Sequence, residues 1–319
     1  MNLAPVVLFV YNRPVHTRRT VEALLKNKEA KESDLIIYSD APKIPEVADA
    51  VREVREYIRA LSGFKSVSIV ERDRNWGLAN SIIDGVTSVV NERGRIIVLE
   101  DDLVVTPHFL DFMNHALDRY ESEQQVMQVA GFTLSTPSDI STDAFLLPVT
   151  TTWGWATWAR AWKHFSSLPV NLEAAKLDKD WRRLFDLNGT CAYSSMLEDR
   201  LEGRNDSWGI LWWYAVSRRN GLVVYPVFSL VWNSGFDGSG THCGSGDFFQ
   251  QNEGSSNLET RPTVTFAFPS AVRFESAHLL QLENYFRSMA KVGKGDVGKK
   301  HKLKIMALKL KSRIINAFN

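Results

Sequence analysis

The chain has 319 residues, of which 44% are hydrophobic and 24% charged, an ordinary balance for a folded protein with a sizeable core. No apolar run approaches the roughly 20 residues that cross a bilayer, and no apolar segment at the start leads to a cleavage-like site. Two cysteines, Cys191 and Cys243, are too few for a disulfide framework or a zinc site. We therefore expect a cytoplasmic protein.

The first third of the chain alternates between two patterns. Short β-branched runs predict strands, and apolar residues at helical spacing predict helices between them. The expected strands cover residues 5–11, 35–38, 67–70 and 96–99, and the expected helices cover residues 17–25, 48–61 and 78–90. Alternating strands and helices predict βαβ units, so the expected fold class is α/β, with a mostly parallel, Rossmann-like sheet flanked by helices.

The pattern changes further along the chain. Residues 103–120 predict a helix with an apolar stripe, and residues 126–132 predict another strand. Beyond about residue 134 tryptophans accumulate, and Trp155, Trp158 and Trp162 predict one face of a further helix. We divide the chain into three segments, which are residues 1–132, 133–265 and 266–319.

Three carboxylates, Glu100, Asp101 and Asp102, arrive together where the strand at 96–99 should end. Ligands of open α/β sheets bind beyond the carboxyl ends of the strands. Adjacent like charges repel unless a cation or solvent offsets them, and a hard divalent metal that carries phosphate oxygens would do so. The alternative is a solvated acidic turn followed by a helix cap.

Two common nucleotide-binding motifs are absent. No GxGxxG follows the first strand, and no GxxxxGK[ST] occurs. Instead, the first strand ends in Tyr11-Asn12-Arg13-Pro14 and the second in Asp40. Taken alone, Arg13 fits an exposed turn and Asp40 a helix N-cap. Together with the acidic triplet, they present an arginine and several carboxylates to one crevice.

These residues resemble the GT-A-fold glycosyltransferases, in particular the N-acetylglucosaminyltransferase I type. The acidic triplet with residues 103–109 is similar to that family's acidic motif, and the Arg13 and Asp40 strand ends are similar too. Gly154-Trp155-Ala156-Thr157-Trp158 and, more loosely, Asp206-Ser207-Trp208 follow in the same order. The resemblance spans roughly residues 5–250 and implies a GT-A fold.

The resemblance implies a role for each strand-end residue. Arg13 would contact the donor diphosphate, for which a planar guanidinium is suited. Asp40 would bind the uracil ring, Glu100 the transferred sugar and Asp101 the ribose. Asp102 would ligate Mn²⁺ or Mg²⁺, with diphosphate and water oxygens completing the octahedron. The implied donor is a UDP-sugar.

Trp155 lies next to Gly154 at the start of the expected helix. Sugars present apolar C–H faces that pack on aromatic rings, so Trp155 is a candidate site residue. A tryptophan stripe is also typical of a core, and we expect Trp158 and Trp162 to be core residues.

An inverting transfer needs a carboxylate that removes the proton of the acceptor hydroxyl. Asp206 aligns with the family's Asp-containing motif before a tryptophan, although the family has two consecutive Asp residues there. Glu198, Asp199 and Glu202 remain competitors for this role. Asp206 also fits the N-cap of a helix over residues 207–218.

The glycine-rich residues 234–244 predict a lid over the nucleotide, because glycine hinges allow closure that excludes water. His242 in this loop is a candidate ligand of the diphosphate or the metal. The alternative is an exposed histidine.

The net charge of +1 hides an asymmetry, because residues 291–319 carry eight Lys, one Arg and one Asp, a net of +8 that leaves −7 for the rest. Residues 299–319 predict a basic amphipathic helix that would bind an anionic membrane surface. A solvated terminal helix, a subunit contact or binding to another polyanion are alternatives. The acidic remainder argues against nucleic-acid binding.

Taken together, the sequence predicts a metal-dependent, inverting glycosyltransferase that moves a sugar from a UDP-sugar to a glycan or lipid-linked acceptor, peripheral at the inner face of the membrane. Residues 1–132 would bind the nucleotide-sugar, 133–265 would form the acceptor side and 266–319 a basic helical tail. The alternatives are a sugar-phosphate nucleotidyltransferase and a catalytically inactive carbohydrate-binding GT-A protein.

Overall fold

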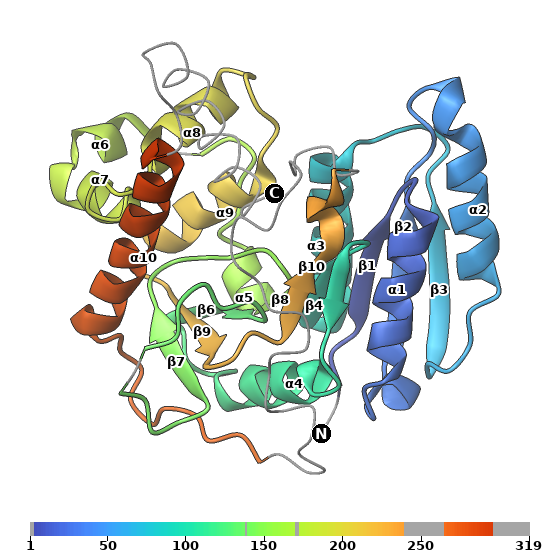
Figure 1. Cartoon of the computed structure of the whole chain (residues 1–319), viewed down its shortest axis with the longest axis horizontal. Helices are drawn as coiled ribbons and strands as arrows, with labels where there is room; N and C mark the ends of the chain where they lie inside the picture. Colours follow the sequence, from blue (N-terminus) through green and yellow to red (C-terminus); the bar gives the residue numbers. More distant parts are fainter. Residues whose placement is uncertain (1–2, 138, 170–171, 239–264, 296–319) are drawn as a thin grey trace.

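The computed structural model describes residues 3–137, 139–169, 172–238 and 265–295 (Figure 1). Within them lies an eight-stranded sheet with the order β3-β2-β1-β4-β8-β6-β9-β7, and a two-stranded ribbon of β5 and β10. The strands are β1 Val6–Val10, β2 Asp34–Ser39, β3 Ser66–Glu71, β4 Arg95–Glu100, β5 Leu103–Val105, β6 Val126–Ala130, β7 Ala144–Leu147, β8 Trp155–Trp158, β9 Leu222–Pro226 and β10 Val231–Asn233. Strands β1 to β4 are mutually parallel, while β8 and β7 pair antiparallel with their neighbours. The expected mostly parallel α/β sheet is confirmed.

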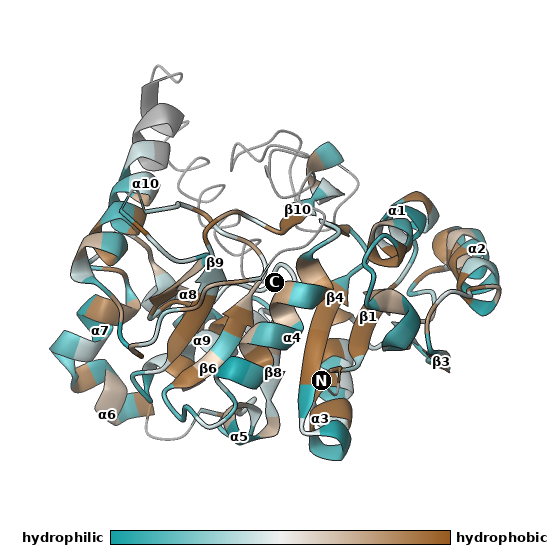
Figure 2. Cartoon of the chain, turned by 90° about the horizontal axis from the view of Figure 1, so that it is seen from below, coloured by the Kyte–Doolittle hydropathy of each residue, from teal (hydrophilic) through white to brown (hydrophobic). Residues whose placement is uncertain are grey.

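Helices cover both faces of the parallel part of the sheet. Helices α1 (Pro14–Leu25) and α2 (Ala48–Arg59) lie on one face, and α3 (Leu78–Arg93) lies on the other (Figures 1 and 2). Right-handed crossovers explain this, because the chain moves outward from β1 to β3 and then returns past β1 to β4. Short 3₁₀ helices, η1 (Ala30–Glu32) and η2 (Pro45–Val47), lie in the connections.

The return of the chain creates a switch point between β1 and β4. Strand β1 is apolar throughout and β4 is apolar between Arg95 and Glu100, as the brown strands in Figure 2 show. Strand β1 pairs in parallel with β2 on one side and β4 on the other. The loops after β1 and β4 diverge at such a point and leave a crevice between them. The predicted site residues Arg13 and Glu100–Asp102 follow these two strands.

The helix expected over residues 103–120 is wrong in its first part. Leu103–Val105 forms β5, which pairs antiparallel with β10, a partner more than 100 residues away in the sequence. Thr106 precedes Pro107, a position that disfavours helical backbone. Helix α4 therefore begins at Phe109 and ends at Arg119, and its predicted apolar stripe is buried.

The helix expected over Trp155–Trp162 is also wrong. Trp155–Trp158 forms β8, which pairs antiparallel with both β4 and β6, and only Ala159–Trp162 is helical, as α5. Both faces of β8 are buried, so large apolar residues recur on each face and mimic a helical stripe.

The remaining helices build the other half of the molecule. They are α6 Leu172–Leu177, α7 Lys179–Phe185, α8 Tyr193–Leu201, α9 Trp208–Ser217, the 3₁₀ helix η3 Ser234–Asp237 and α10 Ser276–Gly295. Helix α9 is buried from Trp208 to Val216, as expected for a helix that is apolar all round. Its N-cap is Ser207, whose hydroxyl accepts from Ile210 N, so the N-cap interpretation of Asp206 is wrong.

No helix in the described residues is long and apolar enough to cross a membrane. The predicted basic tail at 299–319 and the lid residues 239–244, including His242, lie outside the described residues.

Candidate active site

The site begins at the switch point. Arg13 follows β1 and directly precedes α1, where Pro14 occupies the first helical position. Glu100 is the last residue of β4, and Asp101 and Asp102 form the turn into β5. The hydroxyl of Thr20 in α1 donates to the backbone carbonyl of Asp101 at 2.8 Å and fixes this turn against the helix.

The guanidinium of Arg13 bridges two carboxylates. Its Nη2 donates to Asp101 Oδ1 and, at 2.9 Å, to Asp102 Oδ2. Burial acts to lower the pKa of Arg13, but Asp101 and Asp102 outweigh it and raise the pKa, so the arginine stays charged. The three carboxylates therefore already have one counter-ion within the protein.

One arginine does not balance three carboxylates. The formal charge of the cluster is −3 + 1 = −2 when all groups are ionised, and Asp101 and Asp102 are only 4% and 6% exposed. Burial, together with Asp102 and Asp101, raises the pKa of Glu100 well above its ordinary value, and burial also raises the pKa of Asp101 despite Arg13. Buried Glu100 Oε1 has no hydrogen-bond partner within the described residues. Strongly perturbed carboxylates in a crevice are typical of functional sites.

A segment far along the chain packs onto Asp102. Ser234 donates to the Asp102 carbonyl from its backbone N at 2.8 Å and from its hydroxyl at 2.9 Å. Gly235 lies so close that a Cβ there would collide with the Asp102 carboxylate. His16 Nε2 in α1 lies 3.1 Å from Asp237 Oδ2 and ties the end of this segment to the first half. The sequence analysis placed this segment in a lid and missed its contact with Asp102.

Asp40 is held by the loop before α3. Its carboxylate accepts from four groups, which are Ala41 N, Trp76 N, Gly77 N and Asn75 Nδ2, at 2.8 to 3.2 Å. These donors fill the roughly four lone-pair sites of a carboxylate. A direct hydrogen bond from Asp40 to a base would therefore have to displace one of them. Asp40 shapes the site by fixing residues 75–77.

A cavity of about 220 Å³ opens at the carboxyl ends of β1, β2 and β4. Its lining brings together five of the predicted site residues, Arg13, Asp40, Glu100, Asp101 and Asp206. Asp102 does not line the cavity and is ion-paired with Arg13, which does.

Four further lining residues, Tyr11, Tyr38, Lys43 and Asn75, were missed by the sequence analysis. Asn75 follows β3 at the same sheet edge, so the rule that located Asp40 would also have found it.

Asp206 differs from its three competitors. It is exposed, lines the cavity and has no ion-pair or hydrogen-bond partner among the described residues. Asp199 lies 2.6 Å from Arg204, Glu202 pairs with the same arginine, and Glu198 lies 3.7 Å from Arg182. Of these four carboxylates, the structure places Asp206 alone at the cavity.

Trp155 lies away from this cavity. Its ring is fully buried and lies 5.3 Å, stacked, from Trp208 and 6.2 Å from Trp212 between ring centroids. Trp162 packs against Trp155 and Trp212 as well. Trp155 is therefore part of the aromatic core of the second half, as are Trp158 and Trp162.

The described residues hold no group of three His, Cys, Asp or Glu side chains arranged around one metal position. A site with one protein carboxylate and several ligand oxygens does not require such a group.

Comparison with known proteins finds a family match in the first half of the chain. Residues 6–162, just under half of the 319, match the family described as glycosyl transferase family 2. The match ends at the last residue of α5 and includes Arg13, Asp40 and Glu100–Asp102. No curated protein matches the chain.

Several solved structures are similar to parts of this chain. A mannosyltransferase from Pyrobaculum calidifontis, in complex with GDP-Man and Mn²⁺, is 13% identical with a TM-score of 0.35, and the match covers 52% of this chain. The chain spans about half the length of that protein (50%).

Two other structures match at similar levels. Mouse xyloside xylosyltransferase 1 is 13% identical, with a TM-score of 0.33 over 58% of this chain and 75% of its own. A UDP-glucose pyrophosphorylase complexed with UDP-glucose is 12% identical, with a TM-score of 0.27 over 47% and 64%. These TM-scores are low, and the GT-A-like fold rests on the sheet topology and the family match. The narrower resemblance to the N-acetylglucosaminyltransferase I type is not supported.

Proposed function

We propose that the chain is a metal-dependent, inverting glycosyltransferase that uses a UDP-sugar donor. The observation that carries the proposal is the buried acidic cluster at the switch point, with a formal charge of −2, next to a cavity that also contains Asp206. The family 2 match of the residues that form this cluster supports sugar transfer from a nucleotide-sugar.

The residues present fit a divalent cation. Their donors are carboxylate oxygens, which Mn²⁺ and Mg²⁺ prefer, and a charge of +2 would balance the cluster. The buried Glu100 Oε1, which has no hydrogen-bond partner among the described residues, supports a further ligand at this cluster. Asp102 would hold the ion. When bound, the ion would stabilise the negative charge of the leaving diphosphate.

Arg13 and Asp40 organise the donor side. Arg13 holds Asp101 and Asp102 in place and lies at the cavity, where its guanidinium would face the diphosphate. Asp40 anchors residues 75–77, and Tyr38 and Asn75 beside it would bind the base. Glu100 and Asp101, further along the same cavity, would contact the sugar and ribose.

Asp206 is the proposed general base. Its carboxylate would take the proton of the acceptor hydroxyl as that oxygen forms a bond to the anomeric carbon. The bond from this carbon to the diphosphate oxygen breaks in the same step, and the nucleoside diphosphate leaves with its electron pair. An unpaired, solvent-accessible carboxylate at the cavity is free to accept this proton, whereas a carboxylate held by an arginine is a weaker base.

The acceptor is a glycan or lipid-linked hydroxyl, and the proposal of a membrane-bound acceptor rests on the basic residues 299–319 alone. Sedimentation with phosphatidylglycerol vesicles tests it. The full chain should sediment at low salt and a chain truncated after residue 298 should not, whereas equal sedimentation would rule out the tail as the anchor.

The direct test is nucleotide release from UDP-, GDP-, CMP- and dTDP-sugars without acceptor, each with Mn²⁺ or with EDTA. We expect release of UDP from at least one UDP-sugar, with Mn²⁺ only. Release in EDTA would contradict metal dependence. Formation of a UDP-sugar from UTP and a sugar 1-phosphate would instead support a nucleotidyltransferase, and donor binding without cleavage would support an inactive carbohydrate-binding protein.

A further inference from the structure

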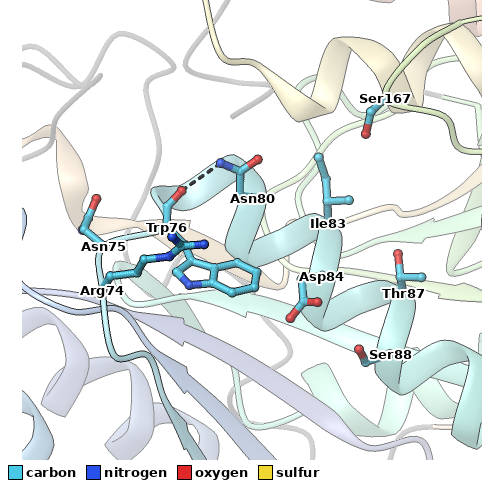
Figure 3. A pocket seen from close by; sticks show the side chains of 9 residues that line it. All are labelled: Arg74, Asn75, Trp76, Asn80, Ile83, Asp84, Thr87, Ser88 and Ser167. Carbon is cyan, nitrogen blue, oxygen red and sulfur yellow. Dashed lines mark hydrogen bonds between the residues drawn. The ribbon is translucent and has the colours of Figure 1, made fainter.

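A second cavity, of about 660 Å³, lies against α3 outside the donor site (Figure 3). One wall is a single face of this helix, made by residues spaced three and four apart, which are Asn80, Ile83, Asp84, Thr87 and Ser88. Residues 74–76 before the helix form a second wall, and Ser167 from the loop after α5 lies across from them. Its volume is in the usual range of small-molecule sites, about 300–1,000 Å³.

The lining offers hydrogen bonds with little net charge. Amides and hydroxyls supply five of its nine residues, and its charged side chains are Arg74 and Asp84, of which Asp84 is ion-paired with Arg72. Such a surface offers hydrogen-bonding groups to a polar ligand, whereas a purely apolar ligand would desolvate them without replacing their bonds to water. It suits a neutral molecule with many hydroxyl groups.

Trp76 supplies an aromatic surface. Figure 3 shows its indole between Arg74 and the face of α3 that carries Asn80 and Asp84. The Arg72 guanidinium carbon lies 3.9 Å from the ring centroid and holds the ring in place. Trp76 Nε1 is buried and has no hydrogen-bond partner among the described residues. Because Nε1 is buried, the part of Trp76 that a ligand in the cavity would meet is the ring itself.

The cavity is joined to the donor site at two points. Asn75 lines both cavities, and its side chain donates to Asp40 Oδ2 and, at 2.8 Å, to the carbonyl of Ala41. The Ser88 hydroxyl in the second cavity lies close to that of Tyr38, which lines the first. An occupant of the second cavity would therefore lie one residue away from a bound donor.

We propose that this second cavity is a binding site for a neutral saccharide, with Trp76 packing on the C–H face of one sugar unit and the amides and hydroxyls of α3 bound to its hydroxyl groups. The proposal rests on the proposed function, since a glycosyltransferase acts on glycans. The saccharide is either a remote unit of the acceptor glycan or a free sugar that binds beside the active site.

The first test is an indole ¹⁵N–¹H spectrum of the full chain, which has ten tryptophans. The Trp76 resonance is the one missing from Trp76→Phe, a change that keeps a ring and removes an unsatisfied donor. Glucose, galactose, mannose, rhamnose and N-acetylglucosamine are titrated as mono- and disaccharides, with glucuronic acid as the anionic comparison. We expect at least one neutral saccharide to shift this resonance and glucuronic acid to leave it in place. No shift with any saccharide would overturn the proposal.

Adding UDP with Mn²⁺ separates this site from the donor cavity. The saccharide-dependent shift should persist in their presence, and complete loss of the shift would mean that the cavity belongs to the donor site, which overturns the proposal. UDP-sugar cleavage is measured on the same preparation, so that failure of the proposed function is seen independently of saccharide binding.

Ser167→Trp distinguishes the two sources of saccharide. The exposed side chain at 167 would fill the cavity, while Leu168→Trp adds the same bulk to a neighbouring exposed residue that does not line it. Both variants should cleave the donor at the wild-type rate. If the site holds part of the acceptor, Ser167→Trp alone raises the acceptor KM about tenfold; if it holds a free sugar, the resonance shift is lost and KM is unchanged. If saccharide still shifted the Trp76 resonance in Ser167→Trp, the saccharide would not bind in this cavity, and the proposal would be overturned.

Discussion

The two halves of the main sheet differ in what lies at their strand ends. The half made by β1 to β4 ends in charged residues, among which the carboxylates of the acidic cluster outnumber the one arginine that pairs with them. The half made by β8, β6, β9 and β7 lies beside α9 and a cluster of stacked tryptophans. It contributes a rigid support, together with Asp206, which directly precedes α9. The first half would bind the donor, and the second would position the base.

The largest expected effect is the loss of activity on replacing Asp206, which lies before the N-cap of α9 and lines the donor cavity. Asp206→Asn should lower kcat of sugar transfer by roughly 10²- to 10⁴-fold, the usual contribution of a general base, with little change in donor affinity. Initial rates at saturating donor test this. Glu198→Gln, Asp199→Asn and Glu202→Gln should each retain most activity, since arginines pair with these residues away from the cavity. If Asp206→Asn remained active and one of these three variants lost a comparable share of kcat, that variant's residue would be the general base instead.

Removing aromatic bulk from the second half should cost stability. Trp155→Ala should lower the free energy of unfolding by about 3–5 kcal/mol, because a fully buried ring that packs on Trp208 and Trp212 would leave a cavity. Urea denaturation measures the change. Leu177→Ala, at an 82% exposed position in the same half, should stay within about 0.5 kcal/mol of wild type. A wild-type midpoint for Trp155→Ala, with loss of sugar transfer, would show a site role instead.

A smaller effect is expected where the second half meets the acidic cluster. In Gly235→Ala the new methyl group would displace the Asp102 carboxylate, and affinity for Mn²⁺ in the presence of UDP should fall about 10- to 100-fold. Ser234→Ala is the control, since it removes one hydroxyl bond and keeps the backbone bond to Asp102. Equal Mn²⁺ affinity in Gly235→Ala and wild type would show that residues 234–235 do not influence metal binding at Asp102.

The smallest expected effect is on the stability of the folded protein, which the ionisation of Glu100 in the acidic cluster lowers. The folded-state pKa of Glu100 is raised above its unfolded value, so its protonated form favours folding, and this stability is lost as pH rises through the folded pKa. Glu100→Gln in EDTA should therefore have a higher Tm than wild type at neutral and alkaline pH, because glutamine cannot ionise. The difference should shrink as pH falls.

Thermal melting across pH checks this, with the exposed Glu53→Gln as control. A Glu100→Gln variant that is less stable than wild type at every pH would contradict the account of an under-compensated cluster.

The sequence predicted the first half of the sheet, strands β1 to β4, better than the second half. Strands β1 to β4 were predicted correctly, because each βαβ unit is specified by local periodicity. Parallel strands end at one edge, which explains why the polar residues after them lie near each other. Arg13, Asp40, Glu100, Asp101 and Asp206 do meet at one cavity.

The second half was harder to predict because its pairing is distant in sequence. Strand β5 depends on β10, and β8 is an antiparallel strand inserted between β4 and β6 whose tryptophans imitate a helix. Sequence spacing also does not encode side-chain directions. It could therefore not predict that Arg13 bridges Asp101 and Asp102, or that residues 75–77 donate hydrogen bonds to the Asp40 carboxylate.

The most direct test of the central claim is thermal melting of wild type and Asp102→Asn with UDP, GDP, CMP and dTDP, each with Mn²⁺ or with EDTA. A ligand at 100 times its Kd stabilises the folded state by about 2.7 kcal/mol, which is readily measured. We predict a Mn²⁺-dependent rise in Tm with UDP that is lost in Asp102→Asn. No rise with any nucleotide, or an equal rise in EDTA and in the variant, would contradict the claim that the acidic cluster binds a metal–diphosphate donor.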